Sequence, residues 1–314
     1  MGDIAIFSGS AHPELAAEIC AQLQVPLYPS RVERFASDCL EVQLLENCRE
    51  RDVFIVQPLC APVQENLVEL LLMLDAARGA SAARRTVVMP FYAYARSDKK
   101  DRPRVSLGGR LVADLLATAG ADRILTMTLH APQVHGFFSV PCDHLHAQHE
   151  LADHFPGLDL TNTVVVSPDL GNAKEAAAFA RMLGVTVAFA AKQRISDDKV
   201  VIGAVIGDVD GKDVIVLDDE IAKGTSVIEL LEHPAMRNIG RVRIACTHGL
   251  FAVGALDRLA ARPDVLEIVS TDTAPIAPER RVPKLTVLSI APAFAEAIRR
   301  IHNGESVSAL FHPA

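Results

Sequence analysis

Two adjacent carboxylates and a short polar loop form the stretch of this sequence with the clearest capacity for chemistry. Asp218 and Asp219 follow the apolar run 214–217, and the loop Ala222-Lys223-Gly224-Thr225-Ser226 precedes a helical pattern. Adjacent carboxylates accept hydrogen bonds from a diol or hold Mg²⁺ through oxygen. A Gly, Thr and Ser loop that opens a helix presents N–H groups and hydroxyls to an anion. A sugar phosphate would satisfy both parts, whereas the alternative is an ordinary strand–turn–helix with an acidic turn.

A second polar segment, residues 96–104, comes after the apolar run 85–89 and carries many charges of both signs. Its position after a strand end, with Tyr92 and Tyr94 nearby, favours contact with a nucleotide over a merely solvated charged turn. The sequence contains no G-x-x-x-x-G-K-[ST] motif, so a Walker-type ATP site is excluded.

Histidines are concentrated in residues 130–154, which hold six of the eleven in the chain. A transition-metal site is conceivable there, but neither an H-x-x-x-H spacing nor a cysteine partner fits a closed zinc geometry. We therefore interpret the region as a surface loop and helix start in which His130 alone has a functional role.

The composition indicates a large protein of two domains. With 314 residues, half of them apolar, the chain exceeds the usual size of one core, so two domains of about 150 residues are expected. The formal net charge of −8 argues against general nucleic-acid binding. Six scattered cysteines without a C-x-x-C pair predict reduced thiols in a cytoplasmic protein. Neither a signal peptide nor a membrane-crossing run is expected.

The elements that must position these residues alternate between strands and helices. Strands are predicted at 4–7, 42–45, 52–56, 85–89, 123–128, 163–166, 185–190, 214–217, 243–246, 266–270 and 286–289, and helices at 12–22, 62–77, 111–119, 173–183, 227–232 and 293–302. Residues 200–209 are predicted as a strand or as a hairpin with its turn at 207–211. This order is typical of parallel α/β folds, in which ligands bind at the carboxyl ends of strands. Similar segments at 120–130 and 240–248 indicate two related domains with a boundary near residues 141–150.

Many short segments together resemble the ribose-phosphate pyrophosphokinase (PRPP synthetase) family. They are Phe7–Leu15, Asp52–Gln57, Glu65–Leu71, Tyr94–Asp101, Leu111–Leu116, Ala119–Arg123, Leu129–Gln133, Gly136–Phe138, Val165–Asp169, Thr247–Gly249 and Ala295–Ser308. The resemblance implies an α/β fold of two phosphoribosyltransferase-type domains, each a mainly parallel sheet flanked by helices. The expected domains are 1–145 and 146–314, with the last helix packing back on the first domain.

The resemblance also implies an activity, the Mg²⁺-dependent transfer of pyrophosphate from ATP to the C1 hydroxyl of ribose 5-phosphate. The products are 5-phosphoribosyl 1-diphosphate (PRPP) and AMP. The positions that match the catalytic pair of a mobile loop are Lys192 and Arg194, and those that match the metal ligands are His130 and Asp169. The ATP site would comprise Phe35, Arg96, Ser97, Asp98 and Asp101. The ribose 5-phosphate site would comprise Asp218, Asp219, Ala222, Lys223, Gly224, Thr225 and Ser226.

Some positions depart from the family pattern. The F-S-[DN]-x-E segment is altered between Phe35 and Glu41, and the D-T-[AG]-G-T loop reads Ala222-Lys223-Gly224-Thr225-Ser226. The acidic and cationic positions named above are retained, which favours an active enzyme. The alternative is a non-catalytic, synthetase-like regulatory subunit. The family also implies a homo-oligomer, dimer or hexamer, with a regulatory site near Arg49, Ser81 and Arg104.

Overall fold

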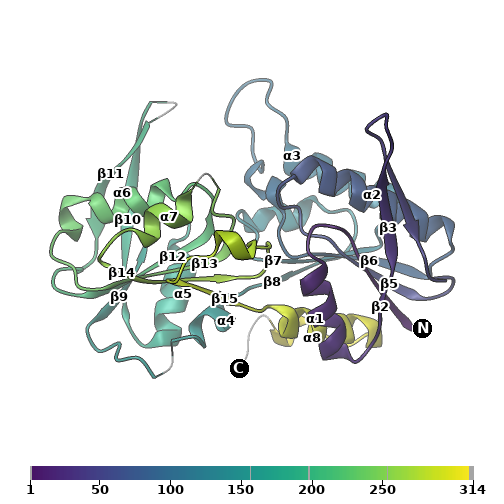
Figure 1. Ribbon diagram of the computed structural model, residues 1–314. Coiled ribbons are helices and arrows are strands. Elements are labelled where there is room, and N and C mark those ends of the chain that lie inside the picture. Colours follow the sequence, from purple (N-terminus) through teal and green to yellow (C-terminus); the bar gives the residue numbers. More distant parts are fainter. Residues whose placement is uncertain (1, 156, 197–198, 253, 311–314) are drawn as a thin grey trace. The chain divides into compact units, whose positions relative to one another are not determined.

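The computed structural model describes residues 2–155, 157–196, 199–252 and 254–310, with side chains except at 192–196, 199–201 and 309 (Figure 1). Contacts between Cα atoms group the chain into two units. The first contains the described residues of Met1–His146, Thr273–Pro275 and Ser289–Ala314, and the second contains those of Ala147–Asp272 and Ile276–Leu288. The C-terminal segment therefore groups with the N-terminal part of the chain.

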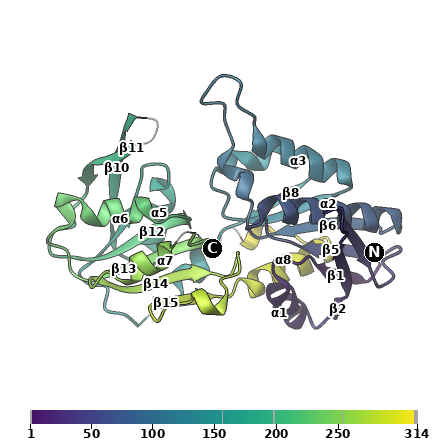
Figure 2. The ribbon, with the colours of Figure 1, turned by 45° about the horizontal axis from the view of Figure 1, so that its top comes forward.

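A six-stranded sheet forms the centre of the first unit. Its order is β2-β1-β5-β6-β7-β8, and every neighbouring pair is parallel. The strands are β1 (Ile4–Ser8), β2 (Leu27–Tyr28), β5 (Asp52–Val56), β6 (Arg84–Met89), β7 (Arg123–Met127) and β8 (Cys142–Leu145). The helices are α1 (Pro13–Leu23), α2 (Val63–Gly79), α3 (Gly108–Ala119) and α8 (Ala291–Asn303). In Figures 1 and 2, α2 and α3 cover one face of the sheet, and α1 and α8 cover the other.

The sequence of β5 explains why both faces of this sheet are covered. Each of its five residues is buried, as expected of a central parallel strand. Val53 and Ile55 belong to the apolar cluster that includes α2 and α3. Because successive side chains of a strand point to opposite faces, the side chain of Phe54 points to the face covered by α1 and α8.

Short elements complete the first unit. An antiparallel hairpin of β3 (Ser30–Arg34) and β4 (Leu40–Leu44) forms a separate two-stranded sheet. The 3-10 turns are η1 (Ala93–Arg96), η2 (Pro132–Phe137) and η5 (Ser308–Leu310). Turns η1 and η2 follow β6 and β7, so the polar residues near them lie at the carboxyl ends of these strands.

A seven-stranded sheet forms the centre of the second unit. Its order is β11-β10-β9-β12-β13-β14-β15, and all neighbours are parallel except the antiparallel pair β10–β11. The strands are β9 (Thr163–Ser167), β10 (Thr186–Ser196), β11 (Lys199–Ile206), β12 (Asp213–Ile221), β13 (Val242–Gly249), β14 (Val265–Thr271) and β15 (Leu285–Leu288). The helical elements are α4 (Gln148–Ala152), α5 (Ala173–Leu183), α6 (Thr225–Glu232), η3 (Pro234–Met236), α7 (Ala255–Ala260) and η4 (Pro278–Arg280).

Alternation along β12 divides this unit's core into two layers. Val214 and Val216 pack in the cluster that contains residues of α6 and α7. Ile215 and Leu217 pack in the cluster that contains residues of α4 and α5. The apolar run 214–217 is therefore continuous because β12 is buried on both faces.

The expected fold class, α/β with two mainly parallel sheets flanked by helices, is confirmed. Each of the six cysteines, all within the described ranges, is a free thiol. Among the described residues, no helix combines the length and apolarity needed to cross a membrane.

Glu296 gives helix α8 a stabilising contact that depends on pH. Its carboxylate accepts hydrogen bonds from Arg299 Nε at 2.8 Å and from Arg300 Nε at 2.6 Å. These hydrogen bonds, from Arg299 first and then Arg300, lower the pKa of Glu296 to about 2. A lowered carboxyl pKa stabilises the fold above the pKa of the unfolded chain, and this stabilisation is lost as the pH falls toward 2.

We therefore expect Glu296→Gln to lower the unfolding free energy by roughly 0.5 kcal/mol at neutral pH, because these partly exposed pairs are screened by solvent. The difference between wild type and variant should shrink as the pH falls from about 5 toward 2. Urea unfolding at a series of pH values measures it. A difference that stays constant over this range would show that the carboxylate charge does not stabilise α8.

Candidate active site

The carboxylates of Asp218 and Asp219 lie in the carboxyl-terminal half of β12. The prediction that the strand ends before them is wrong, because β12 continues to Ile221. On one side its pairing with β9 runs to Val216, while on the other its pairing with β13 continues to Ile221. Asp218 and Asp219 therefore stand beyond the end of the β9 pairing, and both are half-buried.

Cys246 lies opposite Asp218 in the register of β12 and β13. Its side chain is fully buried. Burial first, and then the nearby carboxylates of Asp218, Asp219 and Glu220, raise the pKa of the thiol. The thiol therefore stays protonated, and it packs in the same apolar cluster as Val214 and Val216.

The loop of residues 222–226 joins β12 to α6 as predicted, but the helix begins at Thr225, inside the loop. Gly224 is the N-cap residue and has a φ of +69°, in the left-handed region that favours glycine. A Cβ there would lie 3.4 Å from Leu259 Cδ1. Lys223 and Thr225 are exposed. The first turn of an eight-residue helix thus lies beside a lysine and a hydroxyl, an arrangement that can bind an anion.

Asp169 lies at the same edge of the sheet, just after β9. Ser167 Oγ donates to the carbonyl of Asp169 at 2.6 Å, and the backbone N–H of Asn172 donates to Asp169 Oδ1 at 3.1 Å. Asn172 Nδ2 also donates to the carbonyl of Leu217 at 3.4 Å. This amide links the Asp169 loop to β12 one residue before Asp218, so the structure brings Asp169 to the edge that carries the two acids.

Lys192 and Arg194 lie within β10, in the antiparallel hairpin that β10 forms with β11. The sequence placed them beyond a strand at 185–190, in a mobile loop, and this boundary is wrong because β10 extends to Ser196. In the register of the hairpin Lys192 is opposite Ile202 and Arg194 is opposite Val200. Their side chains lie outside the described residues, so their catalytic roles stay predictions.

The turn of residues 96–98 is anchored to α3 in the first unit. The backbone N–H of Gly108 donates to Ser97 Oγ at 2.8 Å, and that of Gly109 donates to Ser97 O at 3.0 Å. A Cβ on Gly109 would lie 2.9 Å from Tyr94 O, so glycine permits this close approach. Ser97 therefore joins the two ends of the charged loop that carries Asp101. The side chains of Arg96 and Asp101 are exposed.

Asp98 meets the segment that follows β7. Gln133 Nε2 donates to Asp98 Oδ2 at 2.6 Å. His130, in the same segment, is exposed. The structure therefore brings the predicted ATP residue Asp98 to the segment of the predicted metal ligand His130.

His144 supports the backbone next to His130, a role that the sequence did not suggest. The backbone N–H of Leu129 donates to His144 Nε2 at 2.7 Å, which assigns the proton of a neutral ring to Nδ1. The ring of His144 also packs on that of His146, with centroids 4.4 Å apart. Among the described residues, no group of three or more His, Cys, Asp or Glu side chains is arranged to hold a metal.

Phe35 lies apart from the turn of residues 96–98, at the tip of the β3–β4 hairpin, and its side chain is 49% exposed. The tip is closed by Phe35 N–H, which donates to Cys39 O at 2.9 Å, and Asp38 adopts a φ of +71°. In Figures 1 and 2 the hairpin and the loop between η1 and α3 occupy different parts of the unit.

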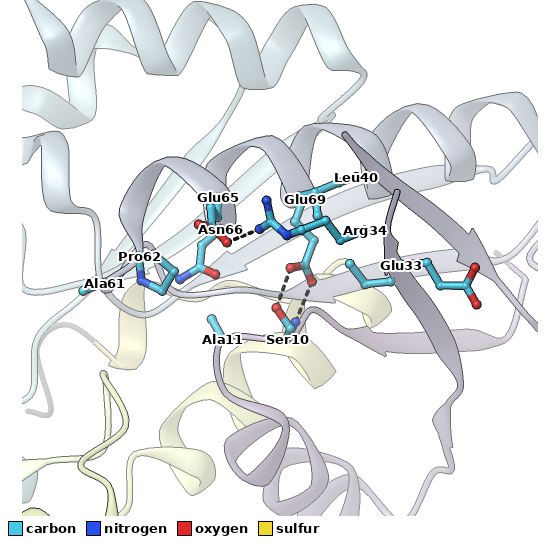
Figure 3. A pocket seen from close by; sticks show the side chains of 11 residues that line it. Ser10, Ala11, Glu33, Arg34, Leu40, Ala61, Pro62, Glu65, Asn66 and Glu69 are labelled. Carbon is cyan, nitrogen blue, oxygen red and sulfur yellow. Dashed lines mark hydrogen bonds and ion pairs between the residues drawn. The ribbon is translucent and has the colours of Figure 1, made fainter. Parts of the chain in front are cut away.

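A pocket of about 340 Å³ lies between this hairpin and the start of α2 (Figure 3). The buried Glu69 accepts hydrogen bonds there from the N–H of Ser10 at 2.6 Å and from Ser10 Oγ. Arg34 at its rim pairs with Glu65. The predicted site residues do not line this pocket.

Two sequence families match the chain. Residues 4–120 match the family described as the N-terminal domain of ribose phosphate pyrophosphokinase. Residues 191–312 match the family described as the phosphoribosyl synthetase-associated domain. The matches cover parts of both units.

Similar proteins match over nearly their full length. A Streptomyces coelicolor protein provisionally named ribose-phosphate pyrophosphokinase is 72% identical over 311 residues, covering 99% of this chain and 98% of that protein. The ribose-phosphate pyrophosphokinase of Deinococcus radiodurans is 50% identical over 312 residues, covering 98% and 97%. The crystal structure of phosphoribosylpyrophosphate synthetase from Mycobacterium smegmatis has a TM-score of 0.90 at 40% identity, covering 96% of this chain and 99% of that one.

Proposed function

The chain belongs to the ribose-phosphate pyrophosphokinase family, and we propose that it transfers pyrophosphate from ATP to the C1 hydroxyl of ribose 5-phosphate. The products are PRPP and AMP. The observation that carries this proposal is the shared sheet edge of the second unit. Asp169, Asp218 and Asp219 lie there, next to a loop that can bind an anion.

The second unit supplies the proposed site for ribose 5-phosphate. Asp218 and Asp219 would accept hydrogen bonds from the sugar diol, since ionised carboxylates are acceptors only. The N–H groups and hydroxyls of residues 224–226 would bind the 5-phosphate. Lys223, which the family pattern lacks, is exposed on this loop and would add a point charge. We propose 146–314 as the domain that holds this site, with the last helix packing back on the first domain.

The first unit supplies the proposed site for ATP, in domain 1–145. Arg96, Ser97, Asp98 and Asp101 would bind the nucleotide, because they follow a strand end and the base of their loop is fixed by Ser97. Because Phe35 lies apart from these residues within one chain, we propose that its exposed ring stacks on the adenine of ATP bound by an adjoining subunit.

The donor set fits Mg²⁺ as the cofactor. Mg²⁺ is usually held by one or two carboxylates together with substrate phosphates and water. The half-buried carboxylate of Asp169, which accepts a hydrogen bond from Asn172 N–H, is proposed as one such ligand, and His130 is the second proposed ligand. The bound ion would neutralise charge on the phosphate oxygens of ATP.

The protein's own contribution is orientation and electrostatic stabilisation. Attack of the C1 hydroxyl on the β-phosphorus builds negative charge on the non-bridging oxygens and on the departing AMP. Lys192 and Arg194 are proposed to stabilise that charge. Exclusion of water around the bound substrates would prevent the hydrolysis of ATP.

We also propose a cytoplasmic homo-oligomer, dimer or hexamer, with a regulatory site at a subunit interface. Two of the three residues expected at that site lie together, since Arg49 Nη1 donates to Ser81 Oγ at 3.4 Å. Arg104, the third, lies in the exposed loop before α3 and has a φ of +62°.

Incubation of the purified protein with ATP, ribose 5-phosphate and Mg²⁺ tests the proposal. PRPP and AMP should accumulate in a 1:1 ratio, and both should fall to background when ribose 5-phosphate is omitted or Mg²⁺ is chelated. Failure to form AMP with any of several nucleoside triphosphates would contradict the proposal and favour the non-catalytic, regulatory alternative.

A further inference from the structure

The loop of residues 222–226 rests on a neighbouring segment, Leu250–Ala252. The backbone N–H of Phe251 donates to the carbonyl of Ile221 at 2.9 Å, and that of Ala252 donates to the carbonyl of Ala222 at 2.8 Å. These hydrogen bonds continue the contact between β12 and β13 past the end of the regular pairing, which stops at Ile221 and Gly249. The position of the loop therefore depends on the position of this segment.

Phe251 holds an unfavourable backbone conformation. Its φ is +42°, in the left-handed region that bulky residues rarely adopt, and its side chain is 1% exposed. Such a conformation persists where the surroundings fix the residue on several sides. Here the ring is packed in the apolar core, the N–H is bound to Ile221, and the carbonyl accepts a hydrogen bond from Arg280.

Two arginines donate to backbone carbonyls around the loop. Arg280, at the end of η4, donates through Nη2 to the carbonyls of Leu250, at 3.2 Å, and Phe251. Arg258, on α7, donates through Nη2 to the carbonyl of Lys223 at 2.6 Å. One arginine thus holds the supporting segment, and the other holds the loop itself.

We propose that Arg258 and Arg280 form a brace that positions the 222–226 loop to bind the phosphate of ribose 5-phosphate. This inference rests on the function proposed above. The two guanidinium groups bond carbonyls, so they are positioning residues and not catalytic ones. Hydrogen bonds from a charged donor are stronger than neutral ones. The hydrogen bond from Arg258 orients the Lys223–Gly224 peptide, and Gly224 is the N-cap residue of α6.

Kinetics of Arg258→Ala and Arg280→Ala test the brace. Each variant should raise the KM for ribose 5-phosphate roughly 5- to 10-fold, the effect of about one lost hydrogen bond. The KM for ATP and kcat should change less than about twofold, because the brace touches only the sugar-phosphate loop. Arg258→Lys, which keeps a charged donor, should recover part of the affinity.

Arg241→Ala is the matched control. Arg241 pairs with Asp213 at the start of β12, at the opposite edge of the same sheet. The Arg241→Ala substitution should leave the KM values for ribose 5-phosphate and ATP unchanged. A brace variant with an unchanged KM for ribose 5-phosphate would overturn the proposal. So would a parallel loss of kcat, both substrate affinities and thermal stability, which indicates general damage to the fold.

Hydrogen exchange of the amides in residues 222–226 gives a second measurement that does not depend on turnover. Exchange should be faster in Arg258→Ala than in wild type and in Arg241→Ala. Unchanged exchange would overturn the brace even if the protein formed no PRPP. Absence of PRPP formation by wild type, in contrast, would contradict the proposed function alone.

Discussion

Replacing Lys192 with alanine is expected to lower kcat for PRPP formation by about 10²- to 10³-fold, the effect of removing one electrostatic donor from a transition state. The side chain is proposed to stabilise charge that develops only as pyrophosphate is transferred. The loss should therefore appear in kcat and not as a matching rise in the KM for either substrate. Steady-state assay of AMP formation measures it.

Lys212→Ala is a suitable control for this prediction. Lys212 pairs with Asp208 at 3.0 Å in the connection that precedes β12, at the amino edge of the sheet. Its removal takes away the same charge from the same unit and should leave kcat unchanged. A Lys192→Ala enzyme with wild-type kcat would remove Lys192 from the mechanism.

Strands β10 and β12 both extend beyond the apolar runs that predict them. The apolar run that predicts a strand ends at Ala190, but β10 continues to Ser196 because it pairs with β11. The same is true of β12, which extends past Leu217 because β13 pairs with it as far as Gly249. In both cases the end of the strand is set by its neighbour, and the hydrophobic pattern of one strand does not include that neighbour.

The common edge of Asp169, Asp218 and Asp219 could be predicted, because polar residues that follow buried parallel strands meet at the carboxyl edge of a sheet. The contacts that hold this edge could not. Asn172, Arg258 and Arg280 each donate to a backbone carbonyl 29–45 residues away in sequence. Every residue has a backbone carbonyl, so the amino-acid sequence does not indicate which carbonyl accepts each of these hydrogen bonds. Helix α7, which carries Arg258, was also missed because it has only six residues.

The largest expected effect on stability is at Asp52. This carboxylate is fully buried in the first unit. It accepts hydrogen bonds from Arg84 Nε at 2.8 Å and from Arg84 Nη2, and His302 Nδ1 lies 2.8 Å from Oδ2. Arg84 also donates to the carbonyl of Ile301 at 2.9 Å. Asp52 on β5 is thus joined to the end of α8 through both partners.

Asp52→Asn should lower the unfolding free energy by about 3 kcal/mol, because removing one partner of a buried ion pair leaves the other charge uncompensated. The side chain of Arg84 is only 20% exposed, so water replaces little of the lost interaction. His302→Ala should have a smaller effect, about 1 kcal/mol, because it removes one hydrogen bond and leaves the Asp52–Arg84 pair intact. Urea unfolding of each variant at neutral pH measures these differences.

Asp122→Asn provides the comparison within the same sheet. Asp122 pairs with Arg85 at 2.7 Å, but its side chain is 38% exposed. The Arg85 side chain is 16% exposed, so the pair is only partly solvated. Because water reaches the Asp122 carboxylate, we expect a loss of about 1 kcal/mol, the upper end for exposed pairs and below that of Asp52→Asn. If Asp52→Asn were no more destabilising than Asp122→Asn, the buried carboxylate would not be what fastens α8 to β5. The apolar residues of α8, including the buried Phe294 and Ile298, would then account for its attachment by packing alone.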